Sequence, residues 1–137
     1  MSKRTYLDAN LLIAAWQVKD DTGARALAIL DDPDRRLVVS DAVWLEVMPK
    51  SLYHKQHNEQ AFYQAIFDQA EVIPWQIAAL HQAHELAQRY GIAAMDAVHV
   101  ALAIAAQVDE FVSAEKPGKP MFRVREIPMR SVRAVTQ

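Results

Sequence analysis

Acidic side chains stand at four places in the chain where a strand is expected to end or a helix to begin. They are Asp8, Glu46, Asp96 and Glu115. Carboxylate oxygens are the ligands that hard divalent cations such as Mg²⁺ and Mn²⁺ prefer. An acid of this kind in each of four separate segments therefore indicates a candidate metal site.

Short apolar runs alternate along the chain with stretches of helical periodicity. Strands are expected at residues 4–7, 37–39, 72–74 and 110–113, with one more edge strand around residues 131–135. Helices are expected at residues 11–16, 23–30, 41–48, 62–70, 77–90 and 97–106, the last of them buried. Strands separated by helices favour a three-layer α/β/α fold with a central parallel sheet of four to five strands. Ligand sites of such sheets lie at the carboxyl ends of the strands, where these acids would meet.

Local signals predict where several of the helices begin and end. Ser40 or Asp41 can cap the helix that follows, because their side-chain oxygens accept hydrogen bonds from free backbone N–H groups. Pro49 lies inside the helical pattern and lacks an N–H, which predicts a kink or break near Met48. Gly91 is expected to end the helix that precedes it.

Each of the four acids also has an ordinary structural interpretation. Asp8 could be a turn residue after a strand, Asp96 a helix N-cap, and Glu115 the first residue of a surface loop. The neighbours of Glu46 suggest partial burial, and an ionised glutamate is rarely buried unless it is paired or bound to a metal. The joint placement of the four acids is what favours a metal site over four separate structural roles.

The composition limits the chemistry that the chain can perform. Its 137 residues correspond to one domain, residues 1–137. It has no cysteine, which excludes disulfides, thiolate metal sites and a thiol nucleophile. Its three glycines are too far apart to form a dinucleotide-binding or Walker phosphate loop. Any phosphate chemistry must therefore use other groups.

The hydropathy pattern suggests a cytoplasmic protein. No apolar run approaches the roughly 20 residues that span a bilayer. The first eight residues lack the apolar stretch of a signal peptide. We therefore expect a cytoplasmic location and no contact with membranes.

The charge of the chain is unevenly distributed. Residues 116–137 carry six basic residues and one acid, a net charge of +5, so residues 1–115 carry −7 of the total of −2. A basic tail beside an acidic body permits a polyanionic partner, although a solvated charged edge is the simpler interpretation. If the tail holds a polyanionic backbone, neutralising Arg123, Arg125, Arg130 and Arg133 should weaken binding and reduce its salt dependence.

The histidines do not form a recognisable metal motif. His81 and His84 precede a glutamate in the order HxxHE, which differs from the zinc motif HExxH. We expect these two, together with His54 and His57, to lie on the surface. His99 follows Asp96 by one helical turn and is expected to be packed or hydrogen-bonded rather than catalytic.

Three segments in this order resemble the motif succession of PIN-domain proteins, and of the small single-domain VapC-type toxins in particular. They are residues 6–12 (YLDANLL), 39–47 (VSDAVWLEV) and 95–103 (MDAVHVALA). The resemblance covers residues 5–122. It implies a PIN-like fold and a Mg²⁺- or Mn²⁺-dependent endoribonuclease.

The resemblance also implies roles for individual residues. Asp8, Glu46 and Asp96 match the three core acids of the family and would hold the metal. Glu115 stands where the fourth catalytic acid is usually an aspartate, so its carboxylate reaches about one methylene further.

Two polar residues match family positions beside these acids. Asn10 and Ser113 would orient water molecules bound to the metal. Such an ion would lower the pKa of a bound water and clamp the phosphate.

The resemblance further implies a type II toxin that acts on RNA, a small antitoxin protein that binds it, and a homodimer. Two other interpretations remain open. A catalytically silent PIN-like regulatory or interaction module would bind metal without cleaving RNA, and the unusual Glu115 leaves room for it. A phospho-acceptor receiver domain ranks lower, because Asp8-Ala9-Asn10 lacks the adjacent acids that such a domain needs.

Overall fold

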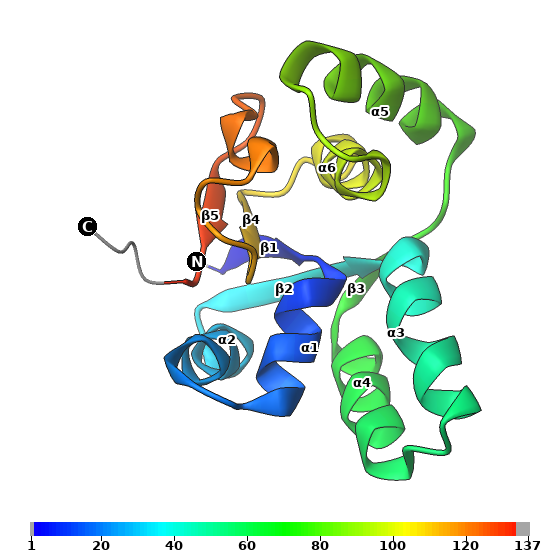
Figure 1. The fold of residues 1–137 in the computed structure, drawn as a ribbon, viewed down its shortest axis with the longest axis vertical. Helices are drawn as coiled ribbons and strands as arrows, with labels where there is room; N and C mark the ends of the chain where they lie inside the picture. Colours follow the sequence, from blue (N-terminus) through cyan, green and yellow to red (C-terminus); the bar gives the residue numbers. More distant parts are fainter. Residues whose placement is uncertain (1, 134–137) are drawn as a thin grey trace.

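A five-stranded parallel sheet forms the centre of the molecule. A computed structural model describes residues 2–133. The strand order is β3-β2-β1-β4-β5, and every neighbouring pair is parallel. The strands are β1 (Lys3–Leu7), β2 (Arg35–Ser40), β3 (Glu71–Ile73), β4 (Glu110–Ser113) and β5 (Met129–Ser131). The sheet crosses the middle of Figure 1.

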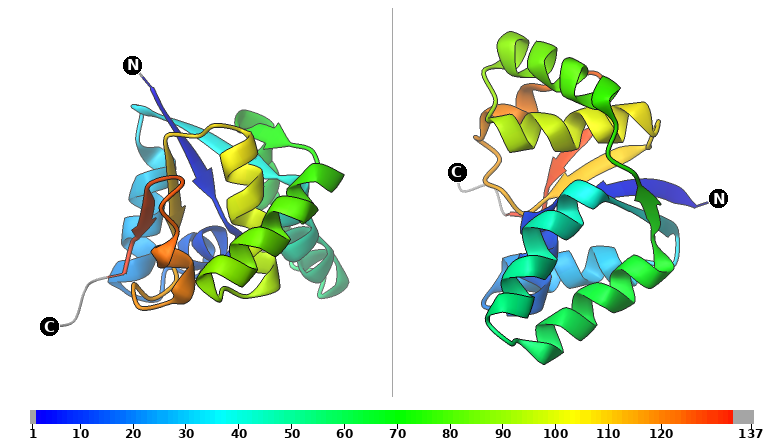
Figure 2. Two further views of the ribbon diagram at one scale, coloured as in Figure 1. Left: turned by 90° about the horizontal axis from the view of Figure 1, so that it is seen from above. Right: turned by 90° about the vertical axis from the view of Figure 1, so that its right-hand side faces the viewer.

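Helices cover both faces of this sheet. The helices are α1 (Ala9–Gln17), α2 (Asp21–Asp31), α3 (Asp41–Tyr53), α4 (His57–Gln69), α5 (Ile77–Tyr90), α6 (Ala94–Ala105) and the short 3₁₀ helix η1 (Pro120–Arg123). In Figures 1 and 2, α1 to α4 lie on one side of the sheet, and α5 and α6 lie on the other. The predicted three-layer α/β/α fold with a parallel sheet is therefore confirmed.

The strand order creates a switch point between β1 and β4. The chain moves from β1 outward to β2 and β3 with its helices on one face. It then returns through α5 and α6 on the opposite face and inserts β4 on the other side of β1. Segments that leave adjacent strands in opposite directions open a crevice at the carboxyl ends of those strands. Asp8 directly follows β1, and Ser113 ends β4.

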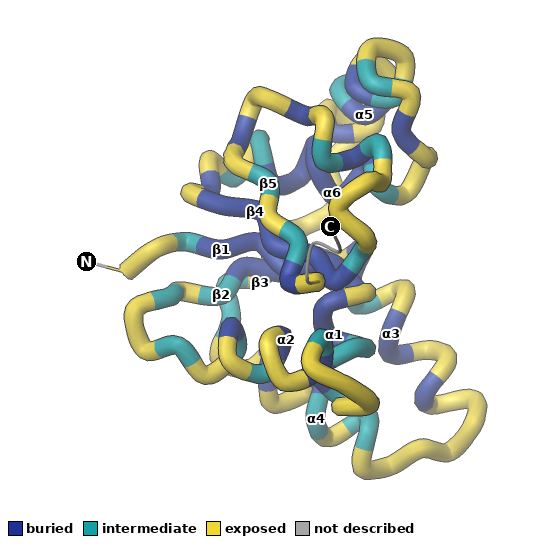
Figure 3. The backbone as a smooth tube through the Cα atoms, turned by 60° about the vertical axis from the view of Figure 1, so that its left-hand side comes forward, coloured by how far each residue is buried: buried dark blue, intermediate teal, exposed yellow. Residues whose placement is uncertain are grey.

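The core lies on both sides of β1. Tyr6 of β1 stacks on Phe111 of β4 with ring centroids 5.2 Å apart, and both side chains are fully buried. Helix α6 packs between α5 and the sheet, and its residues 97–103 are buried without interruption. Figure 3 shows this burial along β1, β4 and α6. The prediction that this helix is buried is confirmed.

Two helix signals behave as expected, and one does not. The Ser40 hydroxyl caps α3 by accepting from the Val43 N–H at 3.3 Å, and Gly91 ends α5 with a φ of 68°. Of the kink or break predicted near Met48, the break does not occur, because α3 runs on through Pro49 to Tyr53. Pro49 has no N–H to donate to the Leu45 carbonyl. Because Leu45 is exposed, water can hydrogen-bond to that carbonyl instead.

The last strand begins earlier than the pattern predicts. Strand β5 pairs Met129 with Phe111 and Ser131 with Ser113, so only the first position of the predicted edge strand at 131–135 belongs to it. The end of that prediction lies outside the described residues. Pairing with β4 decides these bounds, which a weak local pattern cannot show. None of the helices between residues 2 and 133 is long and apolar enough to cross a membrane.

Candidate active site

Asp8 is the most deeply buried acid of the candidate site. Its side chain caps α1 by accepting from the Leu11 N–H at 3.1 Å, and the residue is only 3% exposed. The pKa of Asp8 is raised to about 6, chiefly by burial and to a smaller extent by the charge of Asp96. The nearby Ser113 hydroxyl and His99 act in the opposite direction, because they favour the charged form. An acid held this way readily accepts a cation.

Asp96 projects from the first turn of α6. The residue before that helix is Ala93, which makes no side-chain cap, so the N-cap interpretation of Asp96 is wrong. Burial raises the pKa of the Asp96 carboxyl, and the charges of Glu115 and Glu46 add to the effect. Lys119 lowers it. Asp96 therefore interacts electrostatically with acids contributed by two other segments of the chain.

Glu46 is held by a chain of buried hydrogen bonds. Its side chain is 36% exposed, and its carboxylate contacts Nε2 of His99. Nδ1 of His99 is 2.9 Å from the Tyr6 hydroxyl, which in turn lies 2.7 Å from the Ser40 hydroxyl. The expected partial burial of Glu46 is wrong, because the residue lies at the exposed surface, but its carboxylate is paired with His99. The chain connects α3, α6 and the two central strands β1 and β2.

His99 is packed and hydrogen-bonded, as the sequence predicts, but its partner is one of the site acids. The residue is only 3% exposed. The sequence pattern places it one turn after Asp96 and predicts no part for it in the site. A polar residue in the otherwise apolar run of residues 97–105 is the available signal, because such a group needs a partner when it is buried.

Glu115 also belongs to this cluster. Its backbone N–H donates to the Ser113 hydroxyl at 3.1 Å, which fixes the turn after β4. Its carboxylate accepts from the Asn10 side chain and lies 3.6 Å from Nζ of Lys119. The longer side chain of Glu115 thus reaches α1 on one side and a lysine of its own loop on the other.

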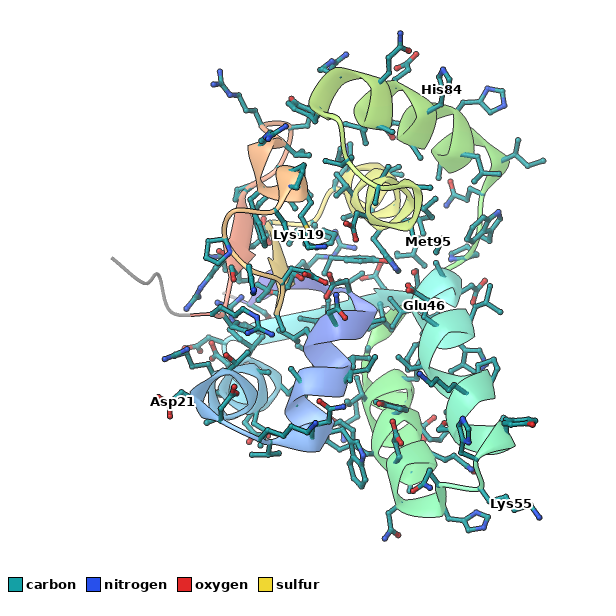
Figure 4. The ribbon with its side chains drawn as sticks, in the orientation of Figure 1. Asp21, Glu46, Lys55, His84, Met95 and Lys119 are labelled. Carbon is teal, nitrogen blue, oxygen red and sulfur yellow. The ribbon has the colours of Figure 1, made fainter. Side chains whose placement is uncertain are left out.

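The tertiary structure places the acids and polar residues that the sequence singled out within reach of pairwise interactions. Asp8 follows β1 and Glu115 follows β4, on the two sides of the switch point, while Glu46 and Asp96 come from helices on opposite faces. Figure 4 shows Glu46 and Lys119 near the middle of the molecule. Within residues 2–133, however, no three acidic or histidine side chains stand close enough to form a complete metal-binding group.

The remaining histidines lie on the surface. His54, His57, His81 and His84 are all exposed on or beside the outer helices, so the prediction of surface roles is confirmed. Figure 4 shows His84 on α5, far from Glu46.

The fold places the chain among α/β proteins with a parallel central sheet, a class in which ligands bind at the carboxyl ends of the strands. The PIN domain family model matches residues 5–116, and the chain belongs to this family. No curated protein sequence matches the chain.

Solved structures of VapC toxins share the fold. The chain matches the VapBC2 structure from Rickettsia felis, bound to a promoter DNA fragment, with a TM-score of 0.70 and 18% identity over 93% of this chain and 98% of that one. VapC20 of Mycobacterium tuberculosis, a sarcin–ricin loop cleaving toxin, matches with a TM-score of 0.67 and 14% identity over 83% and 91% of the two chains. A toxin–antitoxin complex from Klebsiella pneumoniae has a TM-score of 0.67 and 18% identity over 90% and 98%. The resemblance to VapC-type toxins is therefore confirmed at the level of the fold.

Proposed function

We propose that this protein is a divalent-metal-dependent endoribonuclease and the toxin of a type II toxin–antitoxin pair, built as one PIN domain over residues 1–137. The observation that carries the proposal is the convergence of Asp8, Glu46, Asp96 and Glu115 around the switch point of a PIN fold. The sarcin–ricin loop cleaving activity of the similar VapC20 supports an RNA substrate.

The donor chemistry of the site fits Mg²⁺ or Mn²⁺. Asp8, Glu46 and Asp96 would hold the ion through oxygen atoms. Burial and mutual repulsion raise the pKa of Asp8 and of Asp96, and a divalent cation would relieve that repulsion. When bound, such an ion supplies a nucleophilic water and neutralises charge on the phosphoryl oxygens. Because the described side chains do not form a closed set of three ligands, binding requires them to shift.

The protein's own residues would position this chemistry. Asn10 holds the Glu115 carboxylate from α1, and the Ser113 hydroxyl accepts from the Glu115 N–H, so both fix the fourth acid. His99 holds Glu46 from the opposite face of the sheet. In this proposal Asn10 and Ser113 also orient the water molecules around the acids.

The central test is the removal of one charge at a time. Asp8→Asn and Asp96→Asn preserve side-chain volume and should each reduce cleavage of structured RNA by about 100-fold or more, because metal stabilisation of the transition state is worth several kcal/mol. Cleavage is measured with purified protein in Mg²⁺ or Mn²⁺ and in EDTA. Asp68→Asn, on the exposed surface of α4, is the matched control and should cleave normally.

The same experiment separates the alternatives. Full metal-dependent cleavage by both site variants would refute the assignment of Asp8 and Asp96. Cleavage that persists in EDTA would refute the metal dependence. Binding of Mn²⁺ by the wild-type protein without cleavage of any RNA would favour the catalytically silent PIN-like module.

The proposal includes protein partners and a location. An antitoxin partner is supported by the VapBC2 and Klebsiella neighbours, both of which were solved as toxin–antitoxin assemblies. We propose that this antitoxin occupies the acidic site. We also propose a homodimer that acts in the cytoplasm. The molar mass in solution, measured by light scattering, tests the dimer, and a monomer at micromolar concentration would contradict it.

A further inference from the structure

A groove lined by arginines lies between α2 and β5. We call it the arginine groove and define it by Arg25 of α2, Arg130 of β5 and Arg133 just after β5. It has a volume of about 490 Å³, and Arg35 and Asp32 lie at its edge. In Figure 1, α2 and β5 lie on the side of the molecule away from α3.

The three defining arginines give the groove a net positive charge. Arg35 is only 7% exposed and is neutralised by Asp32 at 3.1 Å and Glu110 at 2.9 Å. Arg25, Arg130 and Arg133 are exposed, and none of them forms an ion pair with a carboxylate within the described part of the chain. Charges left unpaired in a concave surface attract anions.

Two of the three guanidinium groups are held in place by backbone carbonyls. Arg25 donates to the Val132 carbonyl at 3.0 Å, and Arg133 donates to the Ala114 carbonyl at 2.6 Å. A guanidinium carries five N–H donors, so each of these groups retains donors for a ligand. A fixed guanidinium is well suited to bind phosphate oxygens, because little side-chain entropy remains to be lost.

The arginine groove is continuous with the candidate active site. Arg133 lines the groove and also a smaller adjoining hollow of about 140 Å³, whose wall includes Asn10 and Glu115. The Ala114 carbonyl that holds Arg133 belongs to the residue directly before Glu115. A chain of phosphates that crosses the acids can therefore continue past Arg133 into the groove.

We propose that the arginine groove binds the phosphate backbone of the RNA strand on one side of the bond that is cleaved. This inference rests on the proposed ribonuclease function and specifies where its substrate lies. A nucleic acid strand is favoured over an acidic peptide, because a strand that reaches the catalytic acids needs repeated phosphate contacts beyond them. Arg133 stands where the two surfaces meet.

The structure divides the basic tail of the sequence into two parts. Arg130 and Arg133 line the groove, whereas Arg123 in η1 donates to the Tyr90 carbonyl at the end of α5 at 3.2 Å. The backbone N–H of Arg125 also lies beside the Tyr90 side chain. The tail residues near α5 carry the same charge at a different place and therefore provide a matched control.

RNA binding in an Asp8→Asn background tests the groove without cleavage. The probe is a fluorescein-labelled single-stranded RNA of about 20 nucleotides, followed by anisotropy between about 50 and 300 mM salt, where affinities that depend on phosphate neutralisation fall steeply. Arg130→Gln with Arg133→Gln should weaken binding about tenfold or more. The plot of log K against log salt should become less steep by about 1.4. This is about 0.7 for each single-strand phosphate that the protein no longer neutralises.

Variants near α5 control for net charge. Arg123→Gln with Arg125→Gln removes the same charge and should change affinity by less than about twofold. Arg133 also donates to the Ala114 carbonyl, so its replacement removes a structural hydrogen bond as well as a charge. The single variants Arg130→Glu and Arg123→Glu therefore repeat the comparison with that bond left in place. Circular dichroism and melting temperature check the fold of every variant.

The outcomes separate the groove from the proposed function. Equal weakening by both pairs would overturn the groove as a specific site. Unchanged RNA binding with weakened binding of an acidic antitoxin peptide would reassign the groove to a protein partner and overturn the proposal. If the wild-type protein cleaves RNA while the groove variants bind it normally, the inference alone fails. If the wild-type protein neither binds nor cleaves any RNA, the proposed function fails with it.

Discussion

The side chain of Asp8 has two roles, since it caps α1 and is the buried acid of the candidate site. Its carboxyl has a pKa of about 6, above the ordinary value of 3.8. The folded state therefore favours the protonated form of Asp8. Protonated Asp8 contributes fully to the stability of the folded state below about pH 4, and this contribution is lost as the pH rises through 6. At neutral pH the ionised, metal-free Asp8 costs about 3 kcal/mol, at about 1.4 kcal/mol for each pH unit between the two pKa values.

Asp8→Asn should therefore stabilise the metal-free protein. The amide oxygen can still accept from the Leu11 N–H, so the cap is retained. In EDTA at pH 7.5 we expect the free energy of unfolding to rise by up to about 3 kcal/mol, and the gain should disappear near pH 4. Urea denaturation at both pH values measures it, with Asp68→Asn as the control. A variant less stable than the wild type by the same amount at both pH values would contradict the argument.

At the scale of elements, α1 is positioned by its contact with α2 as well as by the Asp8 cap. Gly23 in the first turn of α2 approaches the end of α1 closely. A Cβ at Gly23 would lie 2.6 Å from the Cα of Val18 and 2.9 Å from the Ala14 carbonyl oxygen. Both are backbone atoms, which cannot rotate away as the end of a side chain can. The helix pair that presents Asp8 and Asn10 depends on this close approach.

Gly23→Ala should force α1 and α2 apart. Overpacking of this kind costs about 1–3 kcal/mol, and the better helix propensity of alanine, about 1 kcal/mol, offsets part of it. We expect a net loss of about 1 kcal/mol or more in urea denaturation. Gly118→Ala is the matched control, because a Cβ there meets nothing within 4 Å. Equal stability of both variants would show that the helix pair can adjust.

At the scale of the whole molecule, the acids of the −7 body converge from both faces of the sheet on one edge. Such a convergence of like charges is unfavourable without a counterion. A cation that binds the folded state alone therefore raises its stability by mass action.

Divalent ions should raise the melting temperature of the wild-type protein. At a hundred times the dissociation constant the gain is about 2.7 kcal/mol, which is roughly 10 °C for a domain of this size. Asp8→Asn and Asp96→Asn should reduce the rise, whereas NaCl at equal ionic strength should not reproduce it. Differential scanning fluorimetry with Mg²⁺, Mn²⁺ and EDTA measures the shift. An equal rise in both variants would show that the ion binds elsewhere.

Local patterns in the sequence determined the order of strands and helices and the positions of the acids beside them. Strand β4 and the end of α5 at Gly91 follow from such patterns, because a short apolar run and a C-terminal glycine act through nearby residues. The parallel sheet followed from the alternation of elements. The carboxyl edge of that sheet then located the candidate site around Asp8 and Glu115.

Only the tertiary structure decided what each site residue contacts. The bond between His99 and Glu46 joins residues 53 positions apart, and that between Asn10 and Glu115 joins residues 105 apart. The division of the basic tail between Arg133 in the groove and Arg123 beside α5 has the same origin. Such contacts depend on how whole elements pack, and sequence periodicity describes only the face that each element buries. The sequence alone therefore determined which residues could do the chemistry, and packing decided which of them meet.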